Sequence, residues 1–185
     1  MRKTRIRGRV WALTDPNGQL YDDIDTDMIF HNRYLHITDV NQMGQYALDN
    51  LQGWEDFSQK AQAGDIILAG KNFGAGSSRQ QAVDCFRALG IGAVVAESFG
   101  AIYKRNAINS GLPIVALPGL SGLAHEFQSG DELEVDFAGG QVTLYPGGSE
   151  GSNGAKGFQA EPFSQVQMDI YHAGDLFAYG KSLGA

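Results

Sequence analysis

Apolar and polar residues follow one another in blocks that predict strands and helices in alternation. Compact apolar runs bounded by glycine, proline or turn-forming residues are typical of buried strands. Stretches in which apolar residues recur three or four positions apart are typical of helices that pack on one side. The pattern predicts strands over residues 7–13, 64–70, 91–98 and 112–118, and helices over residues 40–51, through Ala82–Leu89, and over residues 99–111.

The run from residue 64 to residue 118 reads strand, helix, strand, helix, strand, which implies parallel strands joined by crossover helices. Residues 131–146 form two alternating runs around Ala-Gly-Gly and predict a β-hairpin. The glycine- and serine-rich segment 146–157 predicts a surface loop, and the last helix is expected to break at Gly174. We therefore expect one α/β domain over residues 1–185, with a parallel strand–helix core and a hairpin appendage.

Composition narrows the class of protein. The hydrophobic fraction of 43% is typical of a globular chain, and no apolar stretch approaches the roughly 18 residues that span a bilayer. The first residues are basic, but charged side chains interrupt them where a signal peptide needs an apolar run. The net charge of −7 argues against nucleic-acid binding. A cytoplasmic protein without a membrane or nucleic-acid partner is expected.

The cysteine and histidine positions show no pattern of a complete metal site. The single cysteine, Cys85, cannot hold an iron–sulfur cluster, which takes about four such ligands. It lies in an apolar helical pattern, which favours a buried structural role. The four histidines are scattered, without the i, i+4 spacing of a zinc site. The chain is therefore expected to bind no metal by itself.

The segment Gly74-Ala75-Gly76-Ser77-Ser78-Arg79 lies between a predicted strand and a predicted helix. Glycines allow a tight turn and close approach to a ligand, and a helix N-terminus favours an anion. Two hydroxyls and a guanidinium at this turn can hold a carboxylate, with Arg79 supplying a bidentate fork. The phosphate-binding motifs fit poorly, because Arg79 replaces a third glycine. Residue types alone leave open the alternative that Ser77 or Ser78 caps the helix.

Three longer segments carry a family resemblance. Residues 71–115, KNFGAGSSRQQAVDCFRALGIGAVVAESFGAIYKRNAINSGLPIV, resemble the core of the aconitase swivel domain, as found in isopropylmalate isomerase and homoaconitase small subunits. The upstream DIDTDMIFHNRYL resembles the Asp-Thr-Asp loop of that family, and DIYHAGDLFAYGK resembles its terminal helix. The resemblance spans nearly the whole chain and is weakest over residues 146–157. It implies a swivel-type β/β/α domain.

The resemblance also implies a chemistry and a partner. Members dehydrate and rehydrate a malate-type hydroxy acid, with a [4Fe–4S] cluster on a large subunit that binds the departing hydroxyl. The position matching Ser77 supplies the base, the one matching Arg79 holds a substrate carboxylate, and Ser78 adds hydrogen bonds. This chain would then be the small subunit of a heteromeric hydro-lyase that is active only with its large subunit. One departure is Gln80-Gln81, where members commonly carry Glu-His or a similar pair.

The Asp-Thr-Asp loop supplies further candidates for substrate binding. Asp27 matches the second acid of the loop, which faces the active site in the family, although Asp25, Thr26 and Asp27 could instead be turn or capping residues. We interpret Asp27 as functional and leave Asp25 open. Arg33 could reach a second carboxylate, but an exposed arginine at a loop–helix junction is equally plausible.

Substrate choice in the family depends on the loop that here reads Tyr34-Leu35-His36-Ile37. Homoaconitase-like members tend to carry arginine at the position of His36, and isopropylmalate enzymes tend to carry an apolar residue. Histidine departs from both, while Leu35 and Ile37 offer apolar surface. The loop therefore favours an alkyl-bearing substrate such as isopropylmalate, in leucine biosynthesis. The alternatives are a homoaconitase-type small subunit and a non-catalytic anion-binding or regulatory module on the same fold.

Overall fold

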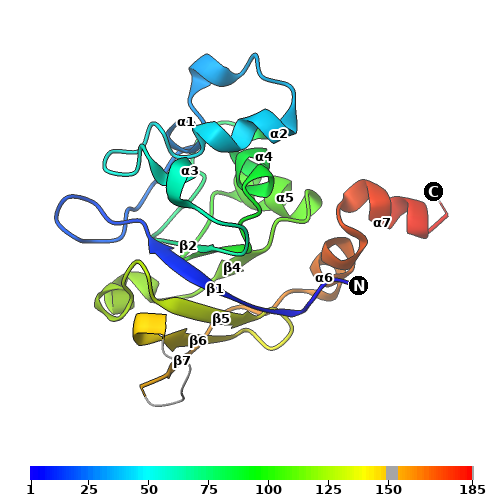
Figure 1. The fold of residues 1–185 in the computed structure, drawn as a ribbon. Helices are drawn as coiled ribbons and strands as arrows, with labels where there is room; N and C mark the ends of the chain where they lie inside the picture. The colour runs from blue at the N-terminus through cyan, green and yellow to red at the C-terminus, as the bar shows by residue number, and fades with distance from the viewer. Residues whose placement is uncertain (149–153, 185) are drawn as a thin grey trace.

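The computed structural model describes residues 1–148 and 154–184 and contains one seven-stranded sheet (Figure 1). The strand order is β4-β3-β2-β1-β5-β6-β7. The strands are β1 (Arg5–Ala12), β2 (Ile66–Ala69), β3 (Ala93–Ala96), β4 (Ile114–Ala116), β5 (Glu132–Asp136), β6 (Gln141–Tyr145) and β7 (Lys156–Gln159). The helices and 3₁₀ turns are α1 (Thr26–Ile29), η1 (Asn32–Tyr34), α2 (Val40–Met43), η2 (Gly44–Tyr46), α3 (Phe57–Lys60), α4 (Gln81–Ala88), α5 (Ala101–Asn109), η3 (Leu120–Glu126), η4 (Pro146–Gly148), α6 (Gln165–Ala173) and α7 (Leu176–Ser182).

Strands β2 to β4 are parallel, which confirms the pairing expected from the alternation over residues 64–118, and β1 also pairs in parallel with β2. The side chains of β2 and β3 are buried on both faces. In β2, Ile67 and Ala69 join the core beneath helices α1, α2, α4 and α5, whereas Ile66 and Leu68 join a second core on the opposite face. A parallel sheet covered on both faces needs such continuous apolar strands.

The second core is closed by the antiparallel half of the sheet. Strand β5 pairs with β1, and β6 and β7 follow in register. Leu133 and Val142 pack with Ile66 and Val95, so the sheet curls back over its own parallel half. Figure 1 shows the helical layer above, the parallel strands in the middle and the antiparallel strands below. This is the expected β/β/α arrangement.

The helix predicted over residues 40–51 is wrong in length. Helix α2 ends at Met43, and its N-cap is Asp39, whose side chain accepts from Asn41 N. After the 3₁₀ turn η2, Ala47 is extended and Leu48 has φ +62°. Leu48 N instead donates to Ile29 O over 2.9 Å. This bond to the last residue of α1 replaces the next helical turn, which is a tertiary contact overriding local periodicity.

The C-terminal third agrees with the hairpin prediction and refines the loop prediction. Strands β5 and β6 form the hairpin, with Gly140 at φ +72° in the turn. Part of the predicted loop 146–157 is ordered, because β7 begins at Lys156 and pairs with β6. Residues 149–153 of that loop lie outside the described residues.

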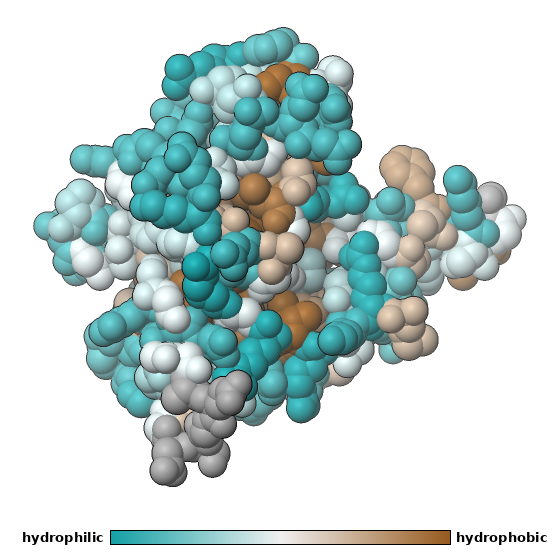
Figure 2. Space-filling model, viewed as in Figure 1, coloured by the Kyte–Doolittle hydropathy of each residue, from teal (hydrophilic) through white to brown (hydrophobic). Residues whose placement is uncertain are grey.

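The final helix breaks at Gly174, as expected, because that residue adopts φ +112° between α6 and α7. Helix α7 projects from the body in Figure 1, and Figure 2 shows apolar surface both along it and in the hollow between the helical layer and the sheet. Phe177 on α7 is 83% exposed. Across residues 1–148 and 154–184, no helix is long and apolar enough to cross a membrane.

Candidate active site

Three loops meet beyond the carboxyl ends of strands β1, β2 and β3. Gly70 N donates to Tyr21 O over 2.9 Å, and Asp23 N donates to Lys71 O over 2.8 Å, which ties the loop after β1 to the loop after β2. Asn72 N donates to Ser98 Oγ over 2.9 Å and ties in the loop after β3. Ligands of α/β sheets bind at this edge, where loops from neighbouring strands converge. The Ser77–Arg79 turn lies in the middle loop.

Glycine is required at the start of the turn for two reasons. Gly74 has φ +78°, and an added Cβ would lie 2.1 Å from Cγ of Tyr103, whose ring is buried against the glycine. Gly74 N donates to Ile24 O over 2.7 Å. The turn is therefore held between α5 on one side and the segment before α1 on the other. Gly76 adopts φ +92° and completes the reversal.

The Asp-Thr-Asp loop pairs directly with the glycine turn. Asp25 and Ala75 form an isolated parallel bridge, with Thr26 N donating to Ala75 O over 3.0 Å. The Asp25 side chain caps α1 by accepting from Asp27 N at 2.9 Å and Met28 N at 2.8 Å. Asp25 thus has the capping role that the sequence left open. The pairing places Asp27 on the same side as Arg79.

Arg79 is held by the Asp-Thr-Asp loop through one nitrogen. Its Nη1 donates to Asp27 Oδ1 over 2.9 Å, to Phe30 O over 2.6 Å and to Thr26 O over 3.3 Å. The side chain is only 12% exposed. Its Nε and Nη2 donate to no group in the described part of the chain. The guanidinium is therefore oriented by one end while its remaining donors are available to a carboxylate.

The pKa of Asp27 is lowered from its ordinary value. Burial raises the pKa, but the hydrogen bond from Arg79, the one from Asn32 N at 2.8 Å and the nearby charges of His31 and Arg79 outweigh it. Asn50 Nδ2 completes the set with bonds to Asp27 O at 3.1 Å and Oδ2 at 3.2 Å. Sequence reasoning missed Asn50 and Asn32, and no local pattern marks either residue as a partner of Asp27.

The two serines are exposed at the tip of the turn, and neither caps α4. The N-cap is Gln80, which makes no side-chain capping bond; its Nε2 donates instead to Ser110 Oγ at 2.8 Å and Asp84 Oδ1 at 3.1 Å. Ser78 Oγ accepts from Asn106 Nδ2 at 3.3 Å, a contact the sequence did not suggest.

The backbone of the turn leaves donors free. Within residues 1–148 and 154–184, the amides of Ser77, Ser78 and Arg79 donate to no other group, and neither does the Ser77 hydroxyl. Consecutive unpaired amides beside a guanidinium form an anion-binding concavity. The arrangement can bind a carboxylate and stabilise a negative oxygen at Ser77.

The predicted specificity loop divides into buried and exposed residues. Tyr34 stacks on Tyr46 with ring centroids 3.9 Å apart and donates to Asp49 Oδ2 over 2.7 Å, and Ile37 packs against the helical core. Leu35 is 41% exposed, and the exposed His36 has Nδ1 3.0 Å from Arg33 O. Arg33 itself is exposed with its guanidinium over the Tyr34 ring. Leu35 and His36 of the loop, and Arg33 just before it, are therefore exposed at the surface.

The residues of this chain do not fit a cluster site. Cys85 is fully buried in α4, and burial raises the pKa of its thiol well above the ordinary value. Among the described residues, no group of three or more histidine, cysteine or acidic side chains is placed to hold a metal ion.

Comparison with known proteins identifies the family. The Aconitase C-terminal domain family matches residues 22–118, which include the Asp-Thr-Asp loop and the Ser77–Arg79 turn. The 3-isopropylmalate dehydratase small subunit of Caldicellulosiruptor bescii is 41% identical over 162 residues, covering 87% of this chain and 90% of the relative. The methanogen homoaconitase small subunit of Methanothermobacter thermautotrophicus is 35% identical over 171 residues, covering 92% and 88%.

A solved structure has the same fold. A crystal structure of 3-isopropylmalate dehydratase from Methanocaldococcus jannaschii superposes with a TM-score of 0.80 at 33% sequence identity, covering 97% of this chain and 95% of that one. The similarity therefore extends over the curled sheet and the C-terminal helices as well as the matched core. The chain belongs to the aconitase C-terminal domain family, among the small subunits of its hydro-lyases.

Proposed function

We propose that this chain is the small subunit of a heteromeric 3-isopropylmalate dehydratase, a cytoplasmic hydro-lyase of leucine biosynthesis. The observation that carries the proposal is the turn itself. At one edge of the sheet it brings together a serine hydroxyl, free backbone amides and a guanidinium that is hydrogen-bonded through Nη1 alone. Relatives of the chain are named for the proposed activity. The substrate class is a malate-type acid with an alkyl branch.

In the proposed reaction, Arg79 binds a substrate carboxylate through Nε and Nη2 and so places the adjacent carbon beside Ser77. The Ser77 oxygen, as its anion, takes the proton from that carbon, and the electron pair forms the double bond as the hydroxyl leaves. Hydroxide then adds to the carbon that lost its proton, while Ser77 returns that proton to the carbon that lost its hydroxyl, which gives the isomer and restores the Ser77 anion. The free amides of the turn and the Arg79 charge favour the Ser77 anion, which an isolated serine could not form at neutral pH.

The departing hydroxyl needs a Lewis acid, and the described residues include no group placed to hold a metal ion. An iron–sulfur cluster on a large partner subunit would supply that Lewis acidity. Ser77 and Ser78 are exposed on the chain alone, so a partner surface is also needed to exclude water from the substrate. The role of this chain is therefore to bind and orient the substrate and to move the carbon-bound proton.

A homoaconitase activity is the second candidate, and His36 is the observation that favours it. His36 is exposed on the loop that follows α1, and its imidazole can hydrogen-bond a distal carboxylate. A related small subunit is named for homoaconitase. Leu35 beside it offers apolar surface, so isopropylmalate dehydratase remains the favoured activity.

Co-purification and reconstitution test the proposal. The tagged chain, expressed in its own cells, is expected to capture a larger chain with a cysteine-ligated cluster. The complex should interconvert isopropylmalate isomers and act less well on homocitrate-type acids. Preferred turnover of the homocitrate-type acid would select the second candidate. A complex that binds these acids without turnover would favour the non-catalytic module.

A further inference from the structure

A cavity lies at the other end of the parallel strands, away from the Ser77–Arg79 turn. It has a volume of about 460 Å³ and is formed by residues that precede β3 and β4, by the last turn of α4, and by the N-terminal segment. Ile91 and Gly92 come directly before β3, and Leu112 and Pro113 come directly before β4. The Ser77–Arg79 turn follows the carboxyl end of β2, so the cavity and the candidate active site lie at opposite edges of the sheet.

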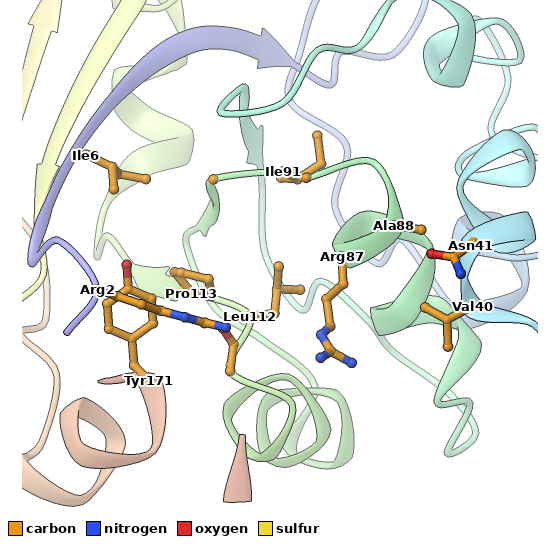
Figure 3. A pocket seen from close by; sticks show the side chains of 13 residues that line it. Arg2, Ile6, Val40, Asn41, Arg87, Ala88, Ile91, Leu112, Pro113 and Tyr171 are labelled. Atoms are coloured by element: carbon orange, nitrogen blue, oxygen red, sulfur yellow. The ribbon is translucent and has the colours of Figure 1, made fainter. Parts of the chain in front are cut away.

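Two arginines, and no acidic residue, are among the described residues that line the cavity. Figure 3 shows the Arg2 and Arg87 side chains reaching toward the same opening, with Leu112 between them. In a chain with 14 Lys and Arg against 21 Asp and Glu residues, a cavity whose only charged lining side chains are arginines is a local reversal of charge. Such a cavity concentrates anions.

Arg2 is held in place without being neutralised. Its Nη1 donates to Gly111 O over 2.8 Å, and its guanidinium lies 5.2 Å from the centroid of the Tyr171 ring. It forms no ion pair with any carboxylate of the described residues. Arg87 pairs with Asp84 through Nη1 alone, at 2.9 Å. Each guanidinium therefore keeps hydrogen-bond donors for a ligand.

Apolar side chains also line the cavity, although polar atoms contribute the larger share of its surface. Ile91 and Leu112 are 5% and 3% exposed and form a floor, and the partly buried Ile6 borders it. The volume falls within the range of small-molecule sites, which combine apolar walls with a few placed polar groups. Asn41 adds one amide at the rim.

From this geometry we infer that the cavity is a second ligand site, for a small carboxylate with an apolar body. The carboxylate lies between Arg2 and Arg87, and the apolar part covers Ile91 and Leu112. This site is separate from the Ser77–Arg79 turn and does not depend on the proposed catalytic activity.

The test uses 4-methylpentanoate as the probe and the full chain, with backbone amide signals followed by NMR. Saturable shifts are expected for Gly90, Gly92 and Gly111, which line the cavity, while Gly74 and Gly76 report binding at the candidate active site. Acetate, which lacks the apolar body, and 4-methylpentanamide, which lacks the charge, should each bind at least about tenfold more weakly.

Substitution of the cavity arginines distinguishes binding of the probe in the cavity from nonspecific binding elsewhere on the surface. Arg2→Gln and Arg87→Gln should each weaken the binding of 4-methylpentanoate by about tenfold, because each substitution removes a charge-assisted contact. Arg105→Gln, on the exposed side of α5, is the matched control and should bind as the wild type does. Thermal unfolding establishes that all three variants are folded. Shifts confined to Gly74 and Gly76, shifts without saturation, or equal binding by all variants would overturn the inference.

Discussion

Arg79 and Asp27 are 52 positions apart in the chain and form an ion pair, with Nη1 of one 2.9 Å from Oδ1 of the other. The pair joins the turn after β2 to the loop after β1. Because Nη1 also meets two carbonyl oxygens of that loop, Asp27 fixes the orientation of the guanidinium as well as compensating its charge.

Removing the Asp27 charge should weaken substrate binding in the reconstituted complex. Asp27→Asn keeps the size of the side chain but loses the charge that orients Arg79, so we expect KM to rise about tenfold with a smaller fall in kcat. Asp56→Asn, which alters an exposed ion pair with Lys60, is the matched control. Steady-state kinetics on both variants makes the comparison; an unchanged KM for Asp27→Asn would count against the orienting role.

The lowered pKa of Asp27 also predicts a pH dependence of stability. A carboxyl whose pKa is lower in the folded than in the unfolded state stabilises the fold above the unfolded value, near pH 4. That contribution is lost as the pH falls through the folded value. The stability of wild type relative to Asp27→Asn should therefore stay constant from pH 7 to about pH 4.5 and decrease below it. Urea denaturation at several pH values measures the difference, and a gap that widens with acid would be the opposite result.

Gly74→Ala should destabilise the chain strongly. The substitution places a Cβ in the Tyr103 ring at a position with φ +78°, so we expect a loss of about 2–5 kcal/mol in the free energy of unfolding. Gly122→Ala is the control, because an added Cβ there meets nothing within 4 Å. Its effect should stay within about 0.5 kcal/mol. Equal stability of the two variants in urea would show that the turn tolerates a side chain.

Much of the fold could be predicted from the sequence because its parallel strands are compact apolar runs closed by glycine. The early end of the helix predicted over residues 40–51 could not be predicted. Its apolar residues do recur at helical spacing, but Leu48 N bonds to a carbonyl 19 positions earlier instead of continuing the helix. The glycine turn at Ser77–Arg79 was predictable from residue types in a short span, and its role as an anion site stays a prediction. Asn50 was not, because its contact with Asp27 joins side chains from separate loops and leaves no local pattern.

Substrate choice should respond to His36 if the exposed part of its loop lines the pocket of the complex. His36→Arg should favour acids with an additional distal carboxylate by roughly tenfold to a hundredfold, through an ion pair in a partly desolvated site. His36→Leu should favour branched alkyl groups by a similar factor at most. The measured quantity is the ratio of kcat/KM for isopropylmalate to that for a homocitrate-type acid. A ratio that stays flat across wild type and both variants would mean that His36 does not contact substrate.

The most direct measurement of the central claim is turnover by the Ser77→Ala complex. If Ser77 removes the carbon-bound proton, its loss should lower kcat by about 10²–10⁴, the range for a general base, while KM and assembly with the large subunit stay close to wild type. Ser182→Ala on α7 serves as the matched control and should retain full activity. The account predicts that large fall in kcat for Ser77→Ala alone, and a Ser77→Ala complex that turns over isopropylmalate at the wild-type rate would contradict it.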